Sequence, residues 1–278
     1  MSEGFFFTAD GCRLAYEDVG EGQPVLWQHG LGANRAQPAE VFPPLPGWRR
    51  ITLECRGHGA SDLGDPAQLT IAQFAEDALA LLDHLQIESA VVGGISLGAA
   101  IALRLAALHP GRVRSLVLAR PAWVAGPSLA SQAAYHEVAE LMRVHGPEEG
   151  ARRFEHSAHL RRIEPVAPDN AVSLRWFFTR PRPETTIALL SRIPLDWPGI
   201  AQDALQRIEA PTLVIGNDPD DAHPLAYAQQ LAVLLPHTGL CQITSKSVNR
   251  SAHVAEFRQV LSGFLAHLVL PLLQETRP

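Results

Sequence analysis

Short apolar runs and stretches of helical periodicity alternate along the first 120 residues of the chain. Each apolar run ends in a turn-forming or polar segment, which is typical of buried strands. The strands expected from these runs cover residues 24–28, 49–54, 89–93 and 113–119. Hydrophobic residues at helical spacing predict a helix over 71–85, and a second helix is expected over 97–109. Strands that alternate with helices predict a mostly parallel sheet covered on both faces.

The pattern changes over residues 123–206, which read as helical and irregular and contain many prolines. Alternation then resumes in the elements expected over 212–216 (strand), 224–235 (helix), 241–244 (strand) and 257–268 (helix). We therefore expect one α/β core from residues 1–122 and 207–278, with residues 123–206 inserted as a helical cap. Ligands bind such sheets beyond the carboxyl ends of the strands, so a cap placed there would be a functional element.

Length, net charge and cysteine content exclude several classes of protein. A length of 278 residues suits one large domain or a domain with an insertion, and the formal net charge of −6 argues against a nucleic-acid partner. No apolar run is long enough to span a membrane, and the amino terminus lacks the features of a signal peptide. The three widely spaced cysteines form no disulfide framework. We expect a cytoplasmic protein that acts on a small molecule, and the sequence leaves its oligomeric state open.

The strongest chemical signal is the segment Gly-Ile-Ser-Leu-Gly at 94–98, which follows an expected strand and opens an expected helix. A serine on such a sharp turn presents its hydroxyl above the sheet, and the flanking glycines let backbone segments approach closely. The helix begins at the serine, so its free amides and positive dipole end face developing negative charge. This arrangement predicts that Ser96 is a nucleophile.

Two further motifs precede the serine in the chain. Residues 29–32 read His-Gly-Leu-Gly after one expected strand, and residues 56–61 read Arg-Gly-His-Gly-Ala-Ser after the next. With the Ser96 segment and the insertion that follows, the chain resembles the α/β-hydrolase superfamily over nearly its whole length, and within it the serine branch of esterase and enol-lactonase type. The resemblance implies a mostly parallel sheet of eight strands with helices on both faces and an inserted helical cap.

The resemblance implies a histidine base just after the last strand. Of the twelve histidines, His237 precedes that strand and His267 lies in the final helix, whereas His253 is expected between the strand and the helix. An imidazole there would take the proton that makes a serine nucleophilic at neutral pH. The family often has Gly-His at this place, and this chain has Ala-His.

The resemblance also places an acid after the strand expected over 212–216. Three aspartates crowd there, and the family pattern selects Asp220, four residues before Pro224. Asp218 is the first alternative and Asp221 the second. At least one of the three is expected to be only a turn or cap residue.

By the same resemblance, the backbone amides of Leu31 and Leu97 would hold an oxyanion. Trp123, Trp176 and Phe177 are candidates for lining a substrate pocket, although most aromatic residues of the cap are expected to pack it onto the core. No metal or organic cofactor is required by this chemistry.

These residues together predict a hydrolase that cleaves a carboxylic ester or lactone of a small molecule through an acyl-enzyme. Serine at position 96 separates the chain from the dehalogenases and epoxide hydrolases of the superfamily, which carry aspartate there. A thioesterase, a carbon–carbon bond hydrolase and a non-catalytic small-molecule receptor remain alternatives on the same residues.

Overall fold

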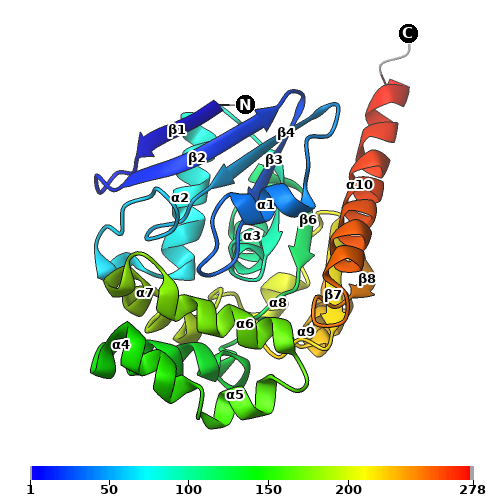
Figure 1. Cartoon of the computed structure of the whole chain (residues 1–278). Coiled ribbons are helices and arrows are strands. Elements are labelled where there is room, and N and C mark those ends of the chain that lie inside the picture. Colours follow the sequence, from blue (N-terminus) through cyan, green and yellow to red (C-terminus); the bar gives the residue numbers. More distant parts are fainter. Residues whose placement is uncertain (1, 276–278) are drawn as a thin grey trace.

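Eight strands form a single sheet in the computed structural model, which describes residues 2–275 (Figure 1). Their order across the sheet is β1-β2-β4-β3-β5-β6-β7-β8. β1 and β2 pair antiparallel, as do β2 and β4, and the remaining neighbours are parallel, which confirms the mostly parallel sheet. The strands are β1 (Ser2–Phe7), β2 (Arg13–Gly20), β3 (Gln23–Gln28), β4 (Trp48–Leu53), β5 (Ala90–Ile95), β6 (Val113–Ala119), β7 (Thr212–Asp218) and β8 (Thr238–Thr244).

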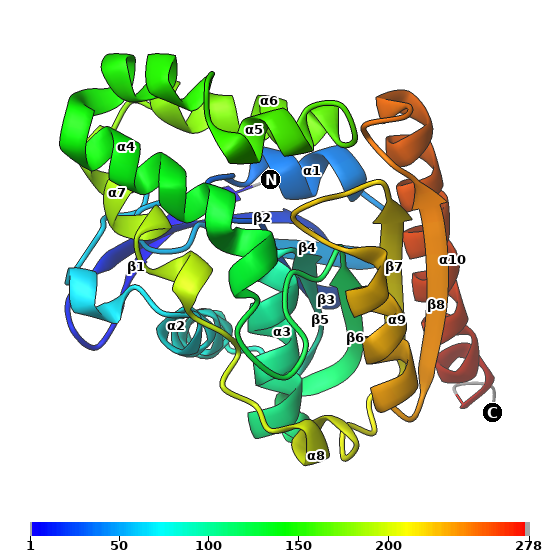
Figure 2. The same ribbon diagram turned by 90° about the horizontal axis from the view of Figure 1, so that it is seen from below.

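Helices cover both faces of this sheet (Figure 2). The α-helices of the described residues are α1 (Ala36–Val41), α2 (Ile71–His84), α3 (Leu97–Leu108), α4 (Leu129–Phe154), α5 (Ala158–Ile163), α6 (Pro168–Trp176), α7 (Pro183–Leu190), α8 (Gln202–Leu205), α9 (Leu225–Leu234) and α10 (Arg250–Glu275). Successive residues of a strand point to opposite faces. Thus Leu26 packs in the cluster formed with α2, α3 and α9, whereas its neighbours Val25 and Trp27 pack in the cluster formed with α1 and α10.

Most expected elements form within three residues of their expected bounds, but the last helix, expected over 257–268, spans 250–275. The helix predicted over 71–85 is α2, whose first turn is capped by the hydroxyl of Thr70, an acceptor for the amide of Gln73 at 3.0 Å. β8 begins three residues before its expected start. The N-terminal pair β1 and β2 and the short α1 were not individually predicted, and β1 carries a run of three aromatic residues, Phe5, Phe6 and Phe7, of which only Phe6 is buried.

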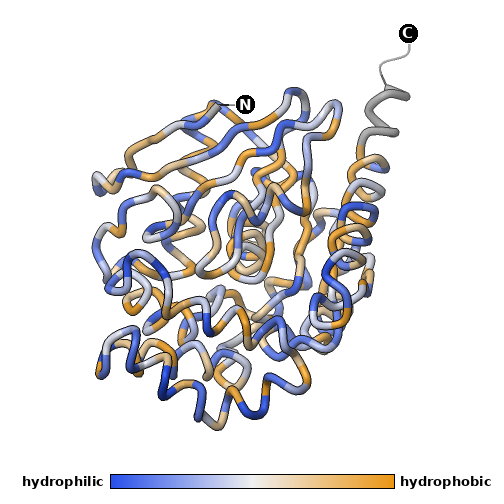
Figure 3. Tube along the Cα trace, in the orientation of Figure 1, coloured by the Kyte–Doolittle hydropathy of each residue, from blue (hydrophilic) through white to orange (hydrophobic). Residues whose placement is uncertain are grey.

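Between β6 and β7 the chain forms helices that pack on one another around an apolar cluster of their own. This cluster includes Val138, Met142, Phe154, Leu160 and Leu174. The helices α4 to α7 lie together at one end of the sheet in Figures 1 and 2. Figure 3 shows hydrophobic positions along the strands, and hydrophobic and hydrophilic positions alternating along these helices.

Within residues 2–275, no helix is both long enough and apolar enough to cross a membrane.

Candidate active site

Ser96 joins β5 to α3 in a strained backbone conformation. Its φ of 57° and ψ of −110° lie in a region of backbone conformation that residues other than glycine rarely adopt. The amide of Ser96 donates to the carbonyl oxygen of Ala119 at the end of β6 (2.9 Å), and its carbonyl accepts from Ala100 in α3 (3.1 Å). Strand, helix and neighbouring strand therefore hold the turn, and Ser96 is directed beyond the carboxyl end of the sheet.

Close backbone packing explains the two glycines of this turn. A methyl group added at Gly98 would lie 2.4 Å from the carbonyl oxygen of Gln28, and one added at Gly94 would lie 2.6 Å from the carbonyl carbon of Gly98. Atoms of a real side chain do not approach backbone so closely, so only glycine permits α3 to start against β3.

We expect Gly98→Ala to destabilise the protein by about 1–3 kcal/mol, because the added methyl group would collide with the backbone of Gln28 at the end of β3. Gly263→Ala in α10 is the matched control, since nothing lies within 4 Å of the added methyl group there. Alanine is the better helix former, so this control should gain up to about 1 kcal/mol. Urea unfolding of both variants measures the difference, and equal effects would contradict the packing argument.

Two backbone amides beside Ser96 have no hydrogen-bond partner among the described residues, those of Leu31 and Leu97. Leu97 is the first residue of α3, where an amide has no acceptor within the helix. On either side of Leu31, the amide of Gly30 donates to Gln37 (2.7 Å) and the amide of Gly32 donates to His58 (3.0 Å). Hydrogen bonds thus hold the loop at Gly30 and Gly32, while the amide of Leu31 between them remains free to donate to a ligand.

Two buried histidines support this loop. His58 Nδ1 faces the carbonyl of Arg56 (2.9 Å), and its Nε2 accepts the Gly32 amide. His29 Nδ1 faces the carbonyl of Gly30 (2.8 Å), and its Nε2 accepts the amide of Cys55 (3.1 Å). Burial lowers the pKa of both imidazoles, so each stays neutral and keeps a nitrogen that can accept.

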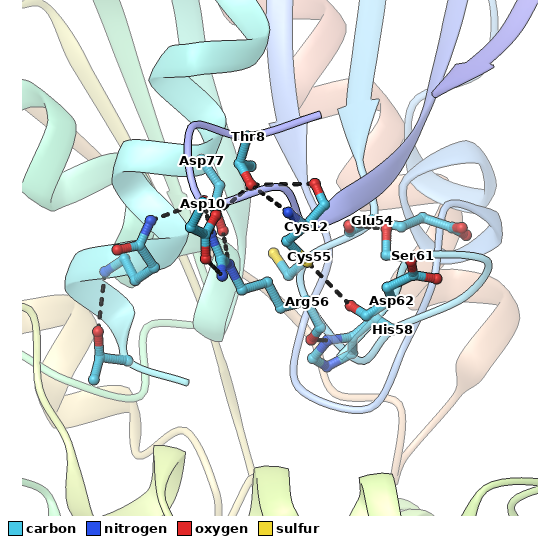
Figure 4. A network of polar contacts seen from close by, with 12 residues as sticks. Thr8, Asp10, Cys12, Glu54, Cys55, Arg56, His58, Ser61, Asp62 and Asp77 are labelled. Carbon is cyan, nitrogen blue, oxygen red and sulfur yellow. Dashed lines mark hydrogen bonds and ion pairs between the residues drawn. The ribbon is translucent and has the colours of Figure 1, made fainter. Parts of the chain in front are cut away.

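The motif at 56–61 forms a polar network behind the loop (Figure 4). Arg56 is fully buried and donates to the carboxylates of Asp77 (2.7 and 2.8 Å) and Asp10 (2.6 and 2.9 Å). The hydroxyl of Ser61 donates to the carbonyl of Glu54 (2.6 Å). These contacts connect β4 with α2 and the N-terminal hairpin, and they give the motif a supporting role.

A cavity of about 570 Å³ opens at Ser96, between the carboxyl end of the sheet and helix α6. Its apolar wall includes Leu31 and two of the aromatic candidates, Trp176 and Phe177. Its polar lining includes Arg120, Asp169, His223, Lys246 and Arg250. Such a volume suits a small molecule.

Trp123, the third aromatic candidate, does not line this cavity. It is 2% exposed and packs in the apolar cluster between the sheet and α3. The prediction for Trp123 was therefore wrong: the chain turns inward after β6, and the large indole fills the core.

Asp220 is the buried member of the three aspartates. One carboxylate oxygen accepts from Arg120 (2.7 and 2.8 Å) and from the amide nitrogen of Asn217 (3.2 Å), and the other faces Nδ1 of His223 at 2.9 Å. Burial alone would raise the pKa of Asp220, but the charges of Arg120 and His223 and their hydrogen bonds hold it well below its ordinary value. Asp218, by contrast, is exposed at the end of β7.

Asp221, the third aspartate, pairs with Arg162 of α5 near the surface. Its amide and that of Ala222 donate to the side-chain oxygen of Asn170 in α6, at 2.6 and 3.2 Å. The loop that carries Asp220 is thus anchored to the helices above it.

His253 lies in a different setting from the one expected. The structure places it within α10, because Asn249 caps the helix by accepting the amide of Ala252 (3.0 Å) and helical structure starts at Arg250. The loop expected to carry the base spans 245–249 and contains Lys246 but no histidine. His253 Nδ1 faces the carbonyl of Thr244 at 2.8 Å, and no described carboxylate contacts the ring.

The charged and histidine side chains that line the cavity were missed in the sequence, and His223, Arg120 and Lys246 are three of them. His223 lies three residues after Asp220 and directly before the proline that precedes α9. Arg120 follows β6, and the structure joins it to a carboxylate a hundred residues away. Lys246 lies in the loop where a base was expected, and it forms no ion pair with a described residue. Only His223 could have been found from the sequence, because it lies three residues after Asp220.

Among the described residues, no group of three or more histidine, cysteine or acidic side chains is arranged to hold a metal ion.

Comparison with known proteins agrees with this architecture. The model of the alpha/beta hydrolase fold family matches residues 23–246. The chain is 30% identical to 3-oxoadipate enol-lactonase 2 of Acinetobacter baylyi over 272 residues, which cover 91% of this chain and 90% of that protein. It is 29% identical to 2-hydroxymuconate semialdehyde hydrolase of Pseudomonas sp. strain CF600, with 93% and 92% covered. Among solved structures, the enol-lactonase of Burkholderia xenovorans LB400 matches with a TM-score of 0.73 at 22% identity, covering 95% and 100% of the two chains, which supports the fold alone.

The chain belongs to the alpha/beta hydrolase family. The relatives that match it over nearly their whole length are hydrolases, and it is an enzyme of this type.

Proposed function

We propose that the protein hydrolyses a carboxylic ester or lactone of a small molecule through an acyl-enzyme on Ser96. The observation that carries this proposal is the strained serine at the mouth of a cavity, flanked by two backbone amides with no partner among the described residues. A tetrahedral intermediate needs donors of this kind for its negative oxygen. Removal of one such donor typically costs two to three orders of magnitude in rate, so their placement matters.

The reaction would proceed in two halves. The hydroxyl oxygen of Ser96 attacks the substrate carbonyl carbon and loses its proton to an imidazole, while the carbonyl electron pair moves to the oxygen beside the amides of Leu31 and Leu97. Collapse breaks the bond to the alcohol oxygen, which takes the proton from the imidazolium. Water then loses a proton to the same imidazole, attacks the acyl carbon and releases the acid, and Ser96 recovers its proton.

The substrate class rests on the relatives and on the cavity. The enol-lactonase relative covers most of this chain, and a cavity of about 570 Å³ with apolar and charged walls fits a small polar molecule. The second full-length relative, the semialdehyde hydrolase, favours carbon–carbon bond hydrolysis as the other candidate on the same serine.

A fluorophosphonate probe tests the proposal. Attack by an activated serine oxygen forms an oxygen–phosphorus bond and expels fluoride, so intact-mass analysis should show one adduct per chain. A panel of matched esters, lactones, thioesters and vinylogous diketones then separates the candidate substrates. A folded protein that forms no adduct and turns over no ester or lactone would contradict the proposal.

The acid limb of kcat/KM should lie below pH 6.5. The base must be neutral to accept a proton, so activity is lost as the pH falls through its pKa in the free enzyme. Burial lowers the pKa of both histidines near the site: that of His253 falls to about 4, and that of His223 is lowered although Asp220 opposes the shift. Hydrolysis rates from pH 4 to 8 measure the limb. A midpoint at or above 6.5 would contradict the lowered pKa.

A further inference from the structure

We propose that Arg180, in the segment between β6 and β7, strengthens the oxyanion site at the amide of Leu31 by its positive charge, without touching the substrate. The inference rests on the function proposed above, because it concerns the negative oxygen of the tetrahedral intermediate. It makes this segment part of the electrostatic environment of the reaction as well as a wall of the cavity.

Arg180 packs on the loop of residues 29–32, at the residue that follows Leu31. A methyl group added at Gly32 would lie 2.9 Å from Nη1 of Arg180 and 2.3 Å from the ring of Phe177. The absence of a side chain at Gly32 therefore leaves the space that these two residues occupy. Since Leu31 and Gly32 are neighbours in the chain, the guanidinium lies close to the amide that would hold the oxyanion.

The charge of Arg180 has no acidic counterpart. Within residues 2–275, no carboxylate forms an ion pair or a hydrogen bond with its side chain, and Nη1 is buried without a partner. The guanidinium carbon lies instead over the rings of Trp176 and Phe177, 5.2 and 5.7 Å from their centroids. Burial lowers the pKa of Arg180 to about 10, so the group stays charged at neutral pH. A partly buried charge that no carboxylate neutralises acts strongly on its neighbours, because solvent screens it little.

This charge already acts on the side chains that support the loop. Burial is the largest cause of the lowered pKa of His29 and His58, and the charge of Arg180 adds to it in both. A field that disfavours a positive imidazole favours a negative oxygen beside Leu31. The substrate carbonyl carries much less negative charge than the oxyanion, so the field stabilises the transition state more than the bound substrate.

Arg180 does not line the active-site cavity. It lines a separate cavity of about 430 Å³, which shares only Asn34 and Trp176 with the first. The charge therefore acts across the loop and not by contact with the substrate. Arg182, two residues further on, has a different environment, because it donates to the carbonyl of Gly59 at 2.7 Å and so fastens the segment to the core.

The variants Arg180→Met and Arg180→Lys test the proposal with p-nitrophenyl acetate, a neutral ester. Methionine keeps much of the apolar bulk and removes the charge, so kcat at pH 7 should fall about tenfold while KM stays within about twofold of the parent. Lysine restores a positive charge, so Arg180→Lys should keep at least about half of the parent kcat. A kcat of Arg180→Met within about twofold of the parent, or equal losses in the two variants, would overturn the proposal.

Arg192→Met is the matched control. Arg192 also lies between β6 and β7 and also has no ion-pair partner among the described residues, but its side chain is exposed and lines neither of the two cavities. Its replacement changes the net charge by the same amount and should alter kcat less than about twofold. A loss as large as that of Arg180→Met would show that net charge, and not the place of Arg180, sets the rate.

Phenylboronic acid separates the charge of Arg180 from its packing. The oxygen of Ser96 adds to boron and its proton passes to the imidazole, so the adduct is a tetrahedral anion beside the oxyanion amides. The inhibition constant should rise in Arg180→Met by about the factor by which kcat falls, and should stay near the parent value in Arg180→Lys. An unchanged inhibition constant in Arg180→Met would refute the proposal.

The pH profile of Arg180→Lys gives a signature that packing alone does not produce. The charged and titratable groups around residue 180 come from its own segment, from the loop and from the lining of the second cavity: Arg182, His29, His58, Arg35 and Glu54. Arginines, carboxylates and neutral imidazoles keep their charge between pH 8 and 10, whereas a desolvated ammonium loses its proton in this range. The kcat of Arg180→Lys should therefore fall with rising pH at least about one unit before that of the parent. Coincident basic limbs in variant and parent would contradict a role for the charge.

Circular dichroism and thermal unfolding establish that each variant is folded. If Arg180→Met does not fold, the pH profile of Arg180→Lys decides the question alone. A parent protein that forms no fluorophosphonate adduct and turns over no ester would remove the proposed function itself, whereas a labelled and active parent with an unaffected Arg180→Met variant would remove only this inference.

Discussion

Replacement of Ser96 by alanine should abolish hydrolysis, with a loss of roughly four to six orders of magnitude in kcat. The hydroxyl oxygen is the atom that forms the acyl bond in the proposed reaction, and no neighbouring side chain replaces it. Alanine keeps the β-carbon and the backbone conformation of the turn, so the variant should fold normally. Intact-mass labelling and initial rates on the best ester or lactone measure the effect.

Ser262→Ala serves as the matched control. This serine donates to the carbonyl of Arg258 within α10, far from the cavity lining. The Ser262→Ala variant should react with the fluorophosphonate probe and should turn over substrate like the parent protein. Residual activity of Ser96→Ala above one-hundredth of the parent would show that another group performs the attack.

Replacement of Asp220 by asparagine should cost both activity and stability. An asparagine cannot balance the imidazolium and favours the wrong tautomer, so kcat should fall by several orders of magnitude, as much as about 10⁴. It also leaves the guanidinium of Arg120 without a counter-ion at a position where its side chain is 8% exposed. Breaking a buried ion pair in this way costs about 3–5 kcal/mol, which should lower Tm by several degrees.

Two comparisons sharpen this second prediction. Asp218→Asn changes an exposed aspartate of the same segment and should affect rate and Tm little. The double variant Arg120→Met/Asp220→Asn removes both charges, so part of the lost stability should return while activity stays low. Greater damage from Asp218→Asn than from Asp220→Asn would transfer the role of the acid to Asp218.

The sheet and its helices could be predicted because their signals are local. Apolar runs and helical periodicity act on neighbouring residues, and most elements they predicted form within three residues of the expected bounds, whereas α10 begins seven residues before and ends seven residues after its expected bounds. The turn at Ser96 belongs to this group, since a strand, a serine and a helix that follow one another define it. Edge elements such as β1 carry weaker signals, because one side of an edge strand faces solvent.

The surroundings of the base could not be predicted in the same way. The start of α10 depends on a single cap contact from Asn249, and a shift of one helical turn decides whether His253 lies in a loop or in a helix. The partners of Asp220 depend on which side chains the fold brings to it. Arg120 is distant in sequence, and His223 is close but was not weighed among the histidines. Contacts of this kind follow from the assembled fold and not from spacing.

The strained backbone at Ser96 has an evolutionary consequence. Glycine adopts a φ of 57° with little penalty, whereas other residues there cost of order 1–3 kcal/mol. A lineage that no longer needed a nucleophile would gain stability from any mutation to glycine at this codon, and selection for folding alone would favour it. Glycine at position 96 would therefore favour folding but would remove the nucleophile of the proposed reaction.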